Sequence, residues 1–161
     1  MKTKENIYSL LNEIPDPEIP VISIVELGVI REIKHDDKTI EVTITPTYSG
    51  CPAMKQMEDD VREKLKANGF EEIKINTVFN PAWTTDWLSK EARQKLQDYG
   101  IAPPEENTTD KSFLTNKPKN ITCPRCKSKN TAMVSQFGST ACKALYKCSD
   151  CLEAFDYFKC I

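Results

Sequence analysis

Residues 123–126 read Cys-Pro-Arg-Cys, and residues 148–151 read Cys-Ser-Asp-Cys. Each C-x-x-C knuckle can present two sulfurs to one ion from a tight turn, and two knuckles complete a tetrahedral site of four thiolates. Strand-like stretches, TAMVSQF and KALYK, lie between them around a Gly-Ser-Thr turn at 138–140. This layout is typical of a zinc ribbon with a closed, structural zinc site. The expected ligands are Cys123, Cys126, Cys148 and Cys151.

Two further cysteines, Cys142 and Cys160, lie in the same C-terminal segment. They are either ordinary free thiols or a second thiol site. Spacing alone does not separate zinc from an iron–sulfur cluster at the knuckles, because both accept four thiolates. A segment of about 40 residues cannot build a sufficient core by itself, so metal binding is expected to supply much of its folding free energy.

The length and composition of the chain restrict the kind of protein it can be. Its 161 residues suit one ordinary domain and a small appendage. No apolar run is long enough for a secretory signal or a membrane span, so we expect a cytoplasmic protein without a membrane partner. Seven cysteines in a reducing compartment indicate metal or redox chemistry. The single histidine, His35, lies in a polar turn, which disfavours histidine-dependent catalysis.

Charge divides the chain near the point where the cysteines begin. Residues 1–116 carry 14 Lys/Arg against 21 Asp/Glu, whereas residues 117–161 carry 8 against 3. We therefore predict an α/β domain at 1–100, a linker at 101–120 and a ribbon domain at 121–161. A basic ribbon could contact the acidic domain or an acidic partner.

Hydrophobic periodicity predicts that the N-terminal domain is α+β, with the element order α-β-β-α-β, a mixed sheet and helices on one face. The chain is expected to begin with a helix capped by Thr3 and a helical turn with a Ser23/Glu26 capping box. An antiparallel hairpin of strands 29–34 and 39–45, around a turn at 35–38, should follow. The remaining elements are a helix that starts at Pro52 and ends at Asn68-Gly69, a strand holding Ile73, Ile75 and Phe79, and a helix from 86 or 88 to 99. Trp83 and Trp87 are interpreted as packing anchors, with a partner-docking surface as the alternative.

Cys51 stands apart from the other cysteines. It follows Gly50 and directly precedes Pro52, so its sulfur is expected near unpaired N–H groups at the positive end of a helix. Such a position lowers a thiol pKa and favours a nucleophilic or metal-binding thiolate. The alternative is a small buried side chain that fills the core. Asp16 and Glu18 are the carboxylate candidates for a paired role, with loop caps as the alternative.

Two stretches, DPEIPVISIVELGVI at 16–30 and TPTYSGCPAM at 45–54, resemble the metal–sulfur cluster assembly family, whose small domain occurs in SufT and in cytosolic iron–sulfur targeting factors. NPAWTTDW at 80–87 and the C-terminal cysteine pattern narrow the resemblance to the PaaD (PaaJ) family of phenylacetyl-CoA epoxidase subunits. The resemblance implies that Cys51 is a reactive loop cysteine. The residues implied around it are Asp16, Glu18, Thr45 and Thr47.

The resemblance also implies a non-catalytic accessory or maturation role in phenylacetate breakdown. The implied partners are subunits of the phenylacetyl-CoA oxygenase complex or iron–sulfur assembly proteins, and the implied cargo is a transient iron–sulfur cluster or iron. The chain itself lacks the carboxylate–histidine helices of a di-iron site, a Rossmann glycine fingerprint and ferredoxin-type cysteine spacing.

Two alternative functions belong to other classes of protein. The basic C-terminal segment permits a nucleic-acid-binding ribbon, but its lysines are scattered and the rest of the chain is acidic. A thiol enzyme with Cys51 as nucleophile would need a base, and no histidine lies near it in the sequence.

Overall fold

The computed structural model describes residues 3–104 and 120–159. The chain forms two compact units, residues 1–89 and 90–161, and the fold is α+β as the sequence predicts. In the first unit the elements are α1 (Lys4–Leu11), β1 (Ile30–His35), β2 (Thr39–Ile44), α2 (Met54–Ala67), β3 (Glu72–Thr77) and the 3-10 helix η1 (Thr85–Trp87). In the second they are α3 (Lys90–Tyr99), β4 (Ile101–Ala102), β5 (Thr131–Ser135), β6 (Lys143–Cys148) and β7 (Ala154–Phe158).

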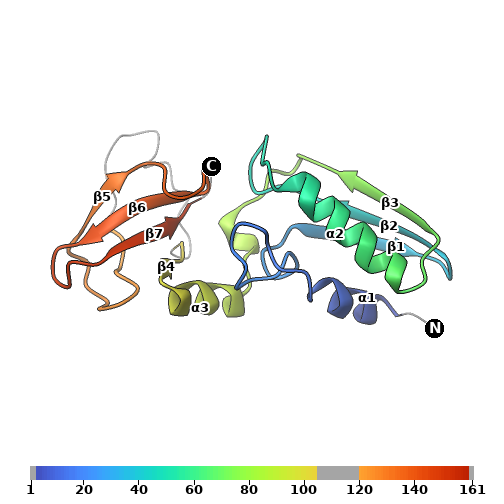
Figure 1. Ribbon diagram of the computed structural model, residues 1–161, viewed down its shortest axis with the longest axis horizontal. Coiled ribbons are helices and arrows are strands. Elements are labelled where there is room, and N and C mark those ends of the chain that lie inside the picture. The colour runs from blue at the N-terminus through green and yellow to red at the C-terminus, as the bar shows by residue number, and fades with distance from the viewer. Residues whose placement is uncertain (1–2, 105–119, 160–161) are drawn as a thin grey trace. The chain divides into compact units, whose positions relative to one another are not determined.

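The first unit has the predicted mixed sheet, in the order β1-β2-β3. β1 and β2 form the antiparallel hairpin, and β3 returns parallel to β2 after the crossover through α2. Helix α2 lies over one face of this sheet (Figure 1), where Met57, Val61 and Leu65 are buried. Helix α1 begins after Thr3, whose side chain accepts a hydrogen bond from the Asn6 N–H, as predicted.

Several element boundaries differ from the prediction. Helix α2 begins at Met54 rather than at Pro52, because Pro52 belongs to a preceding turn that is closed by a hydrogen bond from the Met54 N–H to the Cys51 carbonyl (3.2 Å). Phe79 is exposed beyond β3, since the pairing with β2 ends at Thr77. His35 is the last residue of β1 instead of part of the turn.

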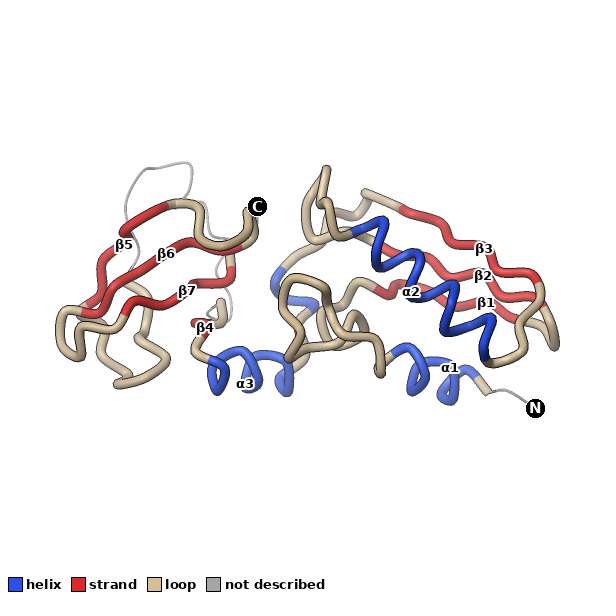
Figure 2. Tube along the Cα trace, in the orientation of Figure 1, coloured by secondary structure: helices blue, strands red, loops and turns tan. Residues whose placement is uncertain are grey.

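Residues 12–29 connect α1 to β1 as a long loop (Figure 2) that is stabilised by local hydrogen bonds. The predicted capping box is present: the Ser23 N–H donates to Glu26 Oε2 (2.9 Å), and the Glu26 N–H donates to Ser23 Oγ (3.0 Å). The turn ends at Gly28, which has a φ of +78°. A Cβ there would lie 2.8 Å from the Trp87 carbonyl oxygen, so both conformation and space require glycine.

The predicted helix up to Tyr99 is divided into η1 and α3, because Leu88 between them is extended. Trp83 is the packing anchor that the sequence suggests: its ring is buried and Nε1 donates to the Leu27 carbonyl (2.9 Å). Trp87 is half-buried, and the Arg31 guanidinium lies 3.5 Å from its ring centroid.

The second unit is built on a sheet in the order β4-β7-β6-β5. Part of the predicted linker joins this sheet, because Ile101 and Ala102 are buried and pair in parallel with β7. Residues 105–119 of that linker lie outside the described residues. The domain borders proposed from the sequence therefore differ from these compact units at α3 and β4. Among the described residues, no helix is both long and apolar enough to cross a membrane.

Candidate functional site

The four knuckle cysteines converge on one point, as predicted. The sulfur atoms of Cys123, Cys126, Cys148 and Cys151 all lie within 4.8 Å of one another. Cys123 Sγ is 3.7 Å from Cys151 Sγ, and Cys126 Sγ is 3.5 Å from Cys148 Sγ. A tetrahedral ion with metal–sulfur bonds of about 2.3 Å requires edges of about 3.8 Å between sulfurs. The donor set therefore fits a closed four-thiolate metal site.

The two knuckles share one backbone conformation. In the first, the Cys123 N–H donates to the Ser128 carbonyl; in the second, the Cys148 N–H donates to the Glu153 carbonyl, both at 2.8 Å. The residue after the second cysteine is left-handed in each, with a φ of 64° at Lys127 and 63° at Leu152. Each knuckle thus presents its sulfurs from the same type of turn, and the site has approximate two-fold symmetry.

Backbone N–H groups surround the sulfurs and influence their charge. The pKa of Cys148 is lowered to about 7, first by the N–H of Cys151 and then by that of Asp150. The N–H of Glu153 also acts on Cys151, but desolvation and the neighbouring thiols raise the Cys151 pKa to about 12. Four thiolates at this spacing therefore need a bound cation to offset their repulsion.

The candidate second thiol site is only partly described. Cys142 is buried, its sulfur lies 3.0 Å from Thr140 Oγ1, and its carbonyl accepts the Lys159 N–H (2.9 Å). Cys160 lies outside the described residues, so the proposed pairing of the two thiols stays a prediction.

Cys51 lies at the end of the loop that joins β2 to α2. Its side chain is 8% exposed, and its sulfur accepts hydrogen bonds from the Ala53 N–H and the Tyr48 hydroxyl. The preceding Gly50 has a φ of +80°, a conformation that L side chains rarely adopt. The loop thus turns at Gly50 and places the thiol just before the first turn of α2.

The expectation of a lowered Cys51 pKa is wrong. The N–H of Ala53 does favour the thiolate, as a helix start should, but burial outweighs it and raises the pKa. The carboxylates of Glu18 and Asp16 raise the pKa further, because negative charge disfavours a neighbouring thiolate.

The same electrostatic effect means that the carboxylates of the DPEIP loop act on Cys51 through space. Asp16 is buried and caps its own loop, since Oδ1 accepts the N–H groups of Glu18 (2.9 Å) and Ile19 (2.7 Å). The loop-cap interpretation of Asp16 is therefore supported, and the structure also brings both carboxylates into the electrostatic range of the thiol.

Thr45 and Thr47 belong to the loop that carries Cys51. The Thr45 N–H donates to the Val29 carbonyl (2.9 Å), and its side chain is buried. In the part of the chain that the structure describes, Thr45 Oγ1 is buried without a hydrogen-bond partner, which normally costs about 1–3 kcal/mol. Thr47 is half-buried.

Sequence reasoning missed Tyr48 and Ala53, the two groups that hydrogen-bond to the thiol. Tyr48 precedes Cys51 by one turn of the loop, and the Cys51 N–H donates to its carbonyl (3.4 Å). The Tyr-Ser-Gly-Cys order at 48–51 was the available signal, because a glycine in a tight turn folds such a tyrosine back toward the cysteine.

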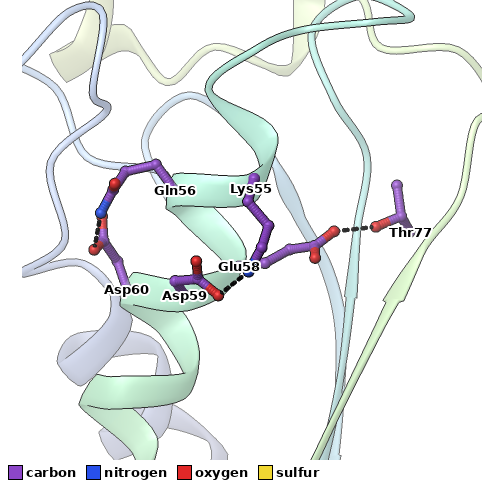
Figure 3. A network of polar contacts seen from close by, with 6 residues as sticks. All are labelled: Lys55, Gln56, Glu58, Asp59, Asp60 and Thr77. Carbon is purple, nitrogen blue, oxygen red and sulfur yellow. Dashed lines mark hydrogen bonds and ion pairs between the residues drawn. The ribbon is translucent and has the colours of Figure 1, made fainter.

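Beyond this loop, polar contacts along α2 (Figure 3) stabilise the helix that follows Cys51. Lys55 pairs with Asp59 at 2.5 Å, and the Gln56 side chain donates to Asp60 at 2.6 Å. The Thr77 hydroxyl donates to Glu58 (2.9 Å) and so joins the helix to β3. The start of the helix is thereby held against the sheet.

Both units of the chain are similar to known protein families. Residues 4–76 match the family described as iron–sulfur cluster assembly protein, and residues 107–159 match the PaaD zinc beta ribbon domain. A solved DUF59 domain from Bacillus anthracis is similar in structure, with a TM-score of 0.54 and 32% identity; the match covers 58% of this chain and 90% of that one. The chain therefore belongs to a class of proteins in which an iron–sulfur assembly domain is followed by a metal-binding ribbon.

Similarity along nearly the whole chain identifies the family. An Escherichia coli (strain K12) protein named as a subunit of 1,2-phenylacetyl-CoA epoxidase is 47% identical over 155 residues, which cover 96% of this chain and 92% of that protein. An "Fe-S protein maturation auxiliary factor" of Porphyromonas gingivalis is 37% identical over 98 residues, 60% of this chain and 92% of that protein. The chain belongs to the PaaD family.

Proposed function

We propose that this chain is a non-catalytic accessory and maturation factor for the multicomponent oxygenase that epoxidises the ring of phenylacetyl-CoA. It holds iron or an iron–sulfur cluster as cargo at Cys51 and delivers it to subunits of that oxygenase. The names of its relatives support the two halves of this proposal, since one is named as an epoxidase subunit and another as a maturation factor for iron–sulfur proteins.

The observation that carries the proposal is the environment of Cys51. A loop thiol lies in the electrostatic range of the carboxylates of Asp16 and Glu18, and thiolates and carboxylates are both ligands of iron. One thiol and its neighbours cannot complete the coordination of a cluster. Open positions suit cargo that must be passed to a recipient, because the recipient's ligands can enter there before Cys51 leaves.

The knuckle site is proposed to hold zinc as a structural ion. Its four sulfurs leave no open position, so substrate or cargo chemistry has no access to the metal there. The ion would hold together a ribbon whose core is small. The buried residues of that core are Ala102, Ile121, Cys123, Ala144, Tyr146, Cys148, Phe155 and Tyr157.

A thiol enzyme is less well supported than a carrier. Burial and two carboxylates raise the Cys51 pKa, so the fraction of nucleophilic thiolate at neutral pH is small. Metal binding overcomes this obstacle, since a coordinating cation stabilises the thiolate directly.

Metal and sulfide analysis of anaerobically purified protein tests the proposal. We expect iron and acid-labile sulfide with the wild type, their loss in Cys51→Ser, and one zinc per chain in both. Cys142→Ser replaces another buried thiol and should behave as the wild type. Wild-type protein that holds zinc but takes up neither iron nor sulfide on anaerobic reconstitution would contradict cargo binding.

A second measurement addresses delivery. Oxygenase components purified from cells that produce only the Cys51→Ser chain should contain less iron than components from wild-type cells. Full metallation of every component in those cells would rule out the maturation role.

A further inference from the structure

Strand β5 forms an exposed edge of the ribbon. Among residues 3–104 and 120–159 it pairs only with β6. The strand and the turn after it expose an unusual amount of apolar surface: Met133 is 42% exposed, Val134 is 59% exposed and Phe137 is 58% exposed. An exposed strand edge flanked by apolar side chains is a template for pairing with another chain.

The other edge strands in the described residues are protected. β1 carries Arg31, Glu32 and Lys34, and β3 carries Glu72 and Lys74, and charged side chains of this kind discourage edge pairing. β4 is two residues long and buried. β5 has neither a charged residue nor a proline between Thr131 and Ser135. Within the described residues, β5 is thus the one edge strand of more than two residues that lacks charged side chains, and its irregularity is confined to the register shift after Met133.

The hydrogen-bond ladder leaves donors and acceptors at this edge. The Ser149 N–H donates to the Asn130 carbonyl, and in an antiparallel pair the bonded residues alternate along the strand. Ala132 therefore faces β6 with its N–H and carbonyl, whereas Met133 points both groups outward. The register shift in β5 falls after Met133, so the outward pair lies on the regular part of the strand.

The charge around β5 selects the partner. The segment from Lys127 to Lys147 contains four lysines and no acidic residue, and the nearby carboxylate of Asp150 accepts hydrogen bonds from Ser128 and Asn130. Lys129 precedes the strand, Lys147 pairs directly with Ala132, and both are exposed. A second copy of the same edge would bring like charges together, whereas an acidic segment would be attracted.

We propose that β5 binds an extended acidic segment of a partner protein, which adds to the ribbon sheet as a further strand. Its backbone pairs with Met133, its apolar side chains cover Val134 and Phe137, and its carboxylates face Lys129 and Lys147. This interface is distinct from Cys51, so its test does not depend on cargo binding.

Two synthetic peptides test the proposal with the full chain. One alternates valine and threonine over six residues with two glutamates at each end; the other has lysines in place of the glutamates. NMR titration of the ¹⁵N-labelled protein follows the amides of 131–135. We expect the acidic peptide to bind about tenfold more tightly than the basic one and to slow exchange of the Met133 amide by about tenfold.

Variants of the chain distinguish binding by strand addition from nonspecific hydrophobic binding. Met133→Pro removes the outward N–H at a position where an edge strand tolerates proline, and it should abolish binding. Val134→Glu should weaken binding of the acidic peptide by about tenfold through repulsion. Phe79→Glu is the matched control, since Phe79 and Val134 are both 59% exposed, and it should leave binding within about twofold.

Other outcomes overturn the proposal. Equal binding of both peptides would mean that charge does not select the partner. Chemical-shift changes confined to other strands would mean that β5 is not the binding site. Concentration-dependent self-association that protects the β5 amides would make a second copy the occupant. A DNA or RNA oligonucleotide that shifts the same amides at physiological salt, where neither peptide does, would assign this face to nucleic acid.

Discussion

The two sulfur sites of this chain differ in how many potential ligand groups each brings together. The knuckle site brings four sulfurs within 4.8 Å of one another from two turns of the same conformation. The Cys51 site supplies one thiol, with two carboxylates in its electrostatic range and the hydroxyl of Thr45 buried in the same loop. A complete set of ligands holds an ion permanently, whereas an incomplete set leaves positions for another molecule.

The sites also differ in how their residues are grouped along the chain. Each knuckle is formed within a few residues, and Asp150 joins the two knuckles by accepting hydrogen bonds from Ser128 and Asn130. The Cys51 site instead combines the 12–29 loop with the loop after β2. The first site therefore stabilises its own unit, whereas the second depends on a unit folded by other contacts.

The largest expected effect is that of Cys148→Ser on the ribbon. Metal-binding free energy in small metal domains is folding free energy, about 10–16 kcal/mol for zinc in zinc-finger peptides. Loss of one ligand should therefore expose the amides of β5, β6 and β7 to rapid hydrogen exchange while β1, β2 and β3 stay protected. Cys142→Ser, in the turn just before β6, is the control and should keep the ribbon protected. If β6 and β7 stay protected in Cys148→Ser, the knuckle site does not stabilise its unit.

Asp16→Ala should have the next largest effect, in the first unit. It leaves the N–H groups of Glu18 and Ile19 without their acceptor, and we expect a loss of about 1–3 kcal/mol in the free energy of unfolding. Urea denaturation of the full chain, followed by a signal from the first unit, measures this change. Asp37→Ala in the exposed hairpin turn is the control and should change stability by less than about 0.5 kcal/mol. Equal effects of the two variants would mean that the carboxylate does not hold the loop.

Cys51→Ser should have a smaller effect on stability than either of these. Serine is close in size to cysteine and can still accept from the Ala53 N–H, so we expect a loss of about 1 kcal/mol or less. The same substitution at Cys148, by contrast, should unfold the ribbon. A Cys51→Ser variant that unfolds the first unit would instead make Cys51 a structural residue, and the two sites would no longer differ in kind.

The features that the sequence predicts well are those that neighbouring residues determine. The knuckle ligands, the Ser23/Glu26 capping box and the strand-helix-strand crossover each depend on short spacing or on periodicity. The Cys51 pKa could not be predicted in this way, because burial and the Glu18 carboxylate come from a distant segment. The short pairing of Ile101–Ala102 with β7 was missed for the same reason, since its partner lies far along the chain.

The smallest expected effect, that of Glu18→Gln, tests whether the two loops of the Cys51 site meet. Glu18 raises the Cys51 pKa more than Asp16 does, so removing its negative charge should lower that pKa. At a pH below the pKa, a lower pKa means a larger thiolate fraction, and the thiolate is the form that reacts. Alkylation of the Glu18→Gln variant should therefore be about two- to threefold faster than that of the wild type at pH 7.5. Mass spectrometry of the Cys51 peptide after treatment of zinc-loaded, iron-free protein with iodoacetamide measures this rate.

The pH dependence separates this effect from a looser loop. The two rates should converge above the wild-type pKa, because both thiols are then fully ionised, whereas greater access to the sulfur would raise the rate at every pH. Glu5→Gln in the exposed first turn of α1 is the charge-matched control and should leave the rate unchanged. An identical profile for Glu18→Gln and the wild type would place the carboxylate outside the range of the thiol. The Cys51 site would then lose the feature that makes it more than a buried cysteine.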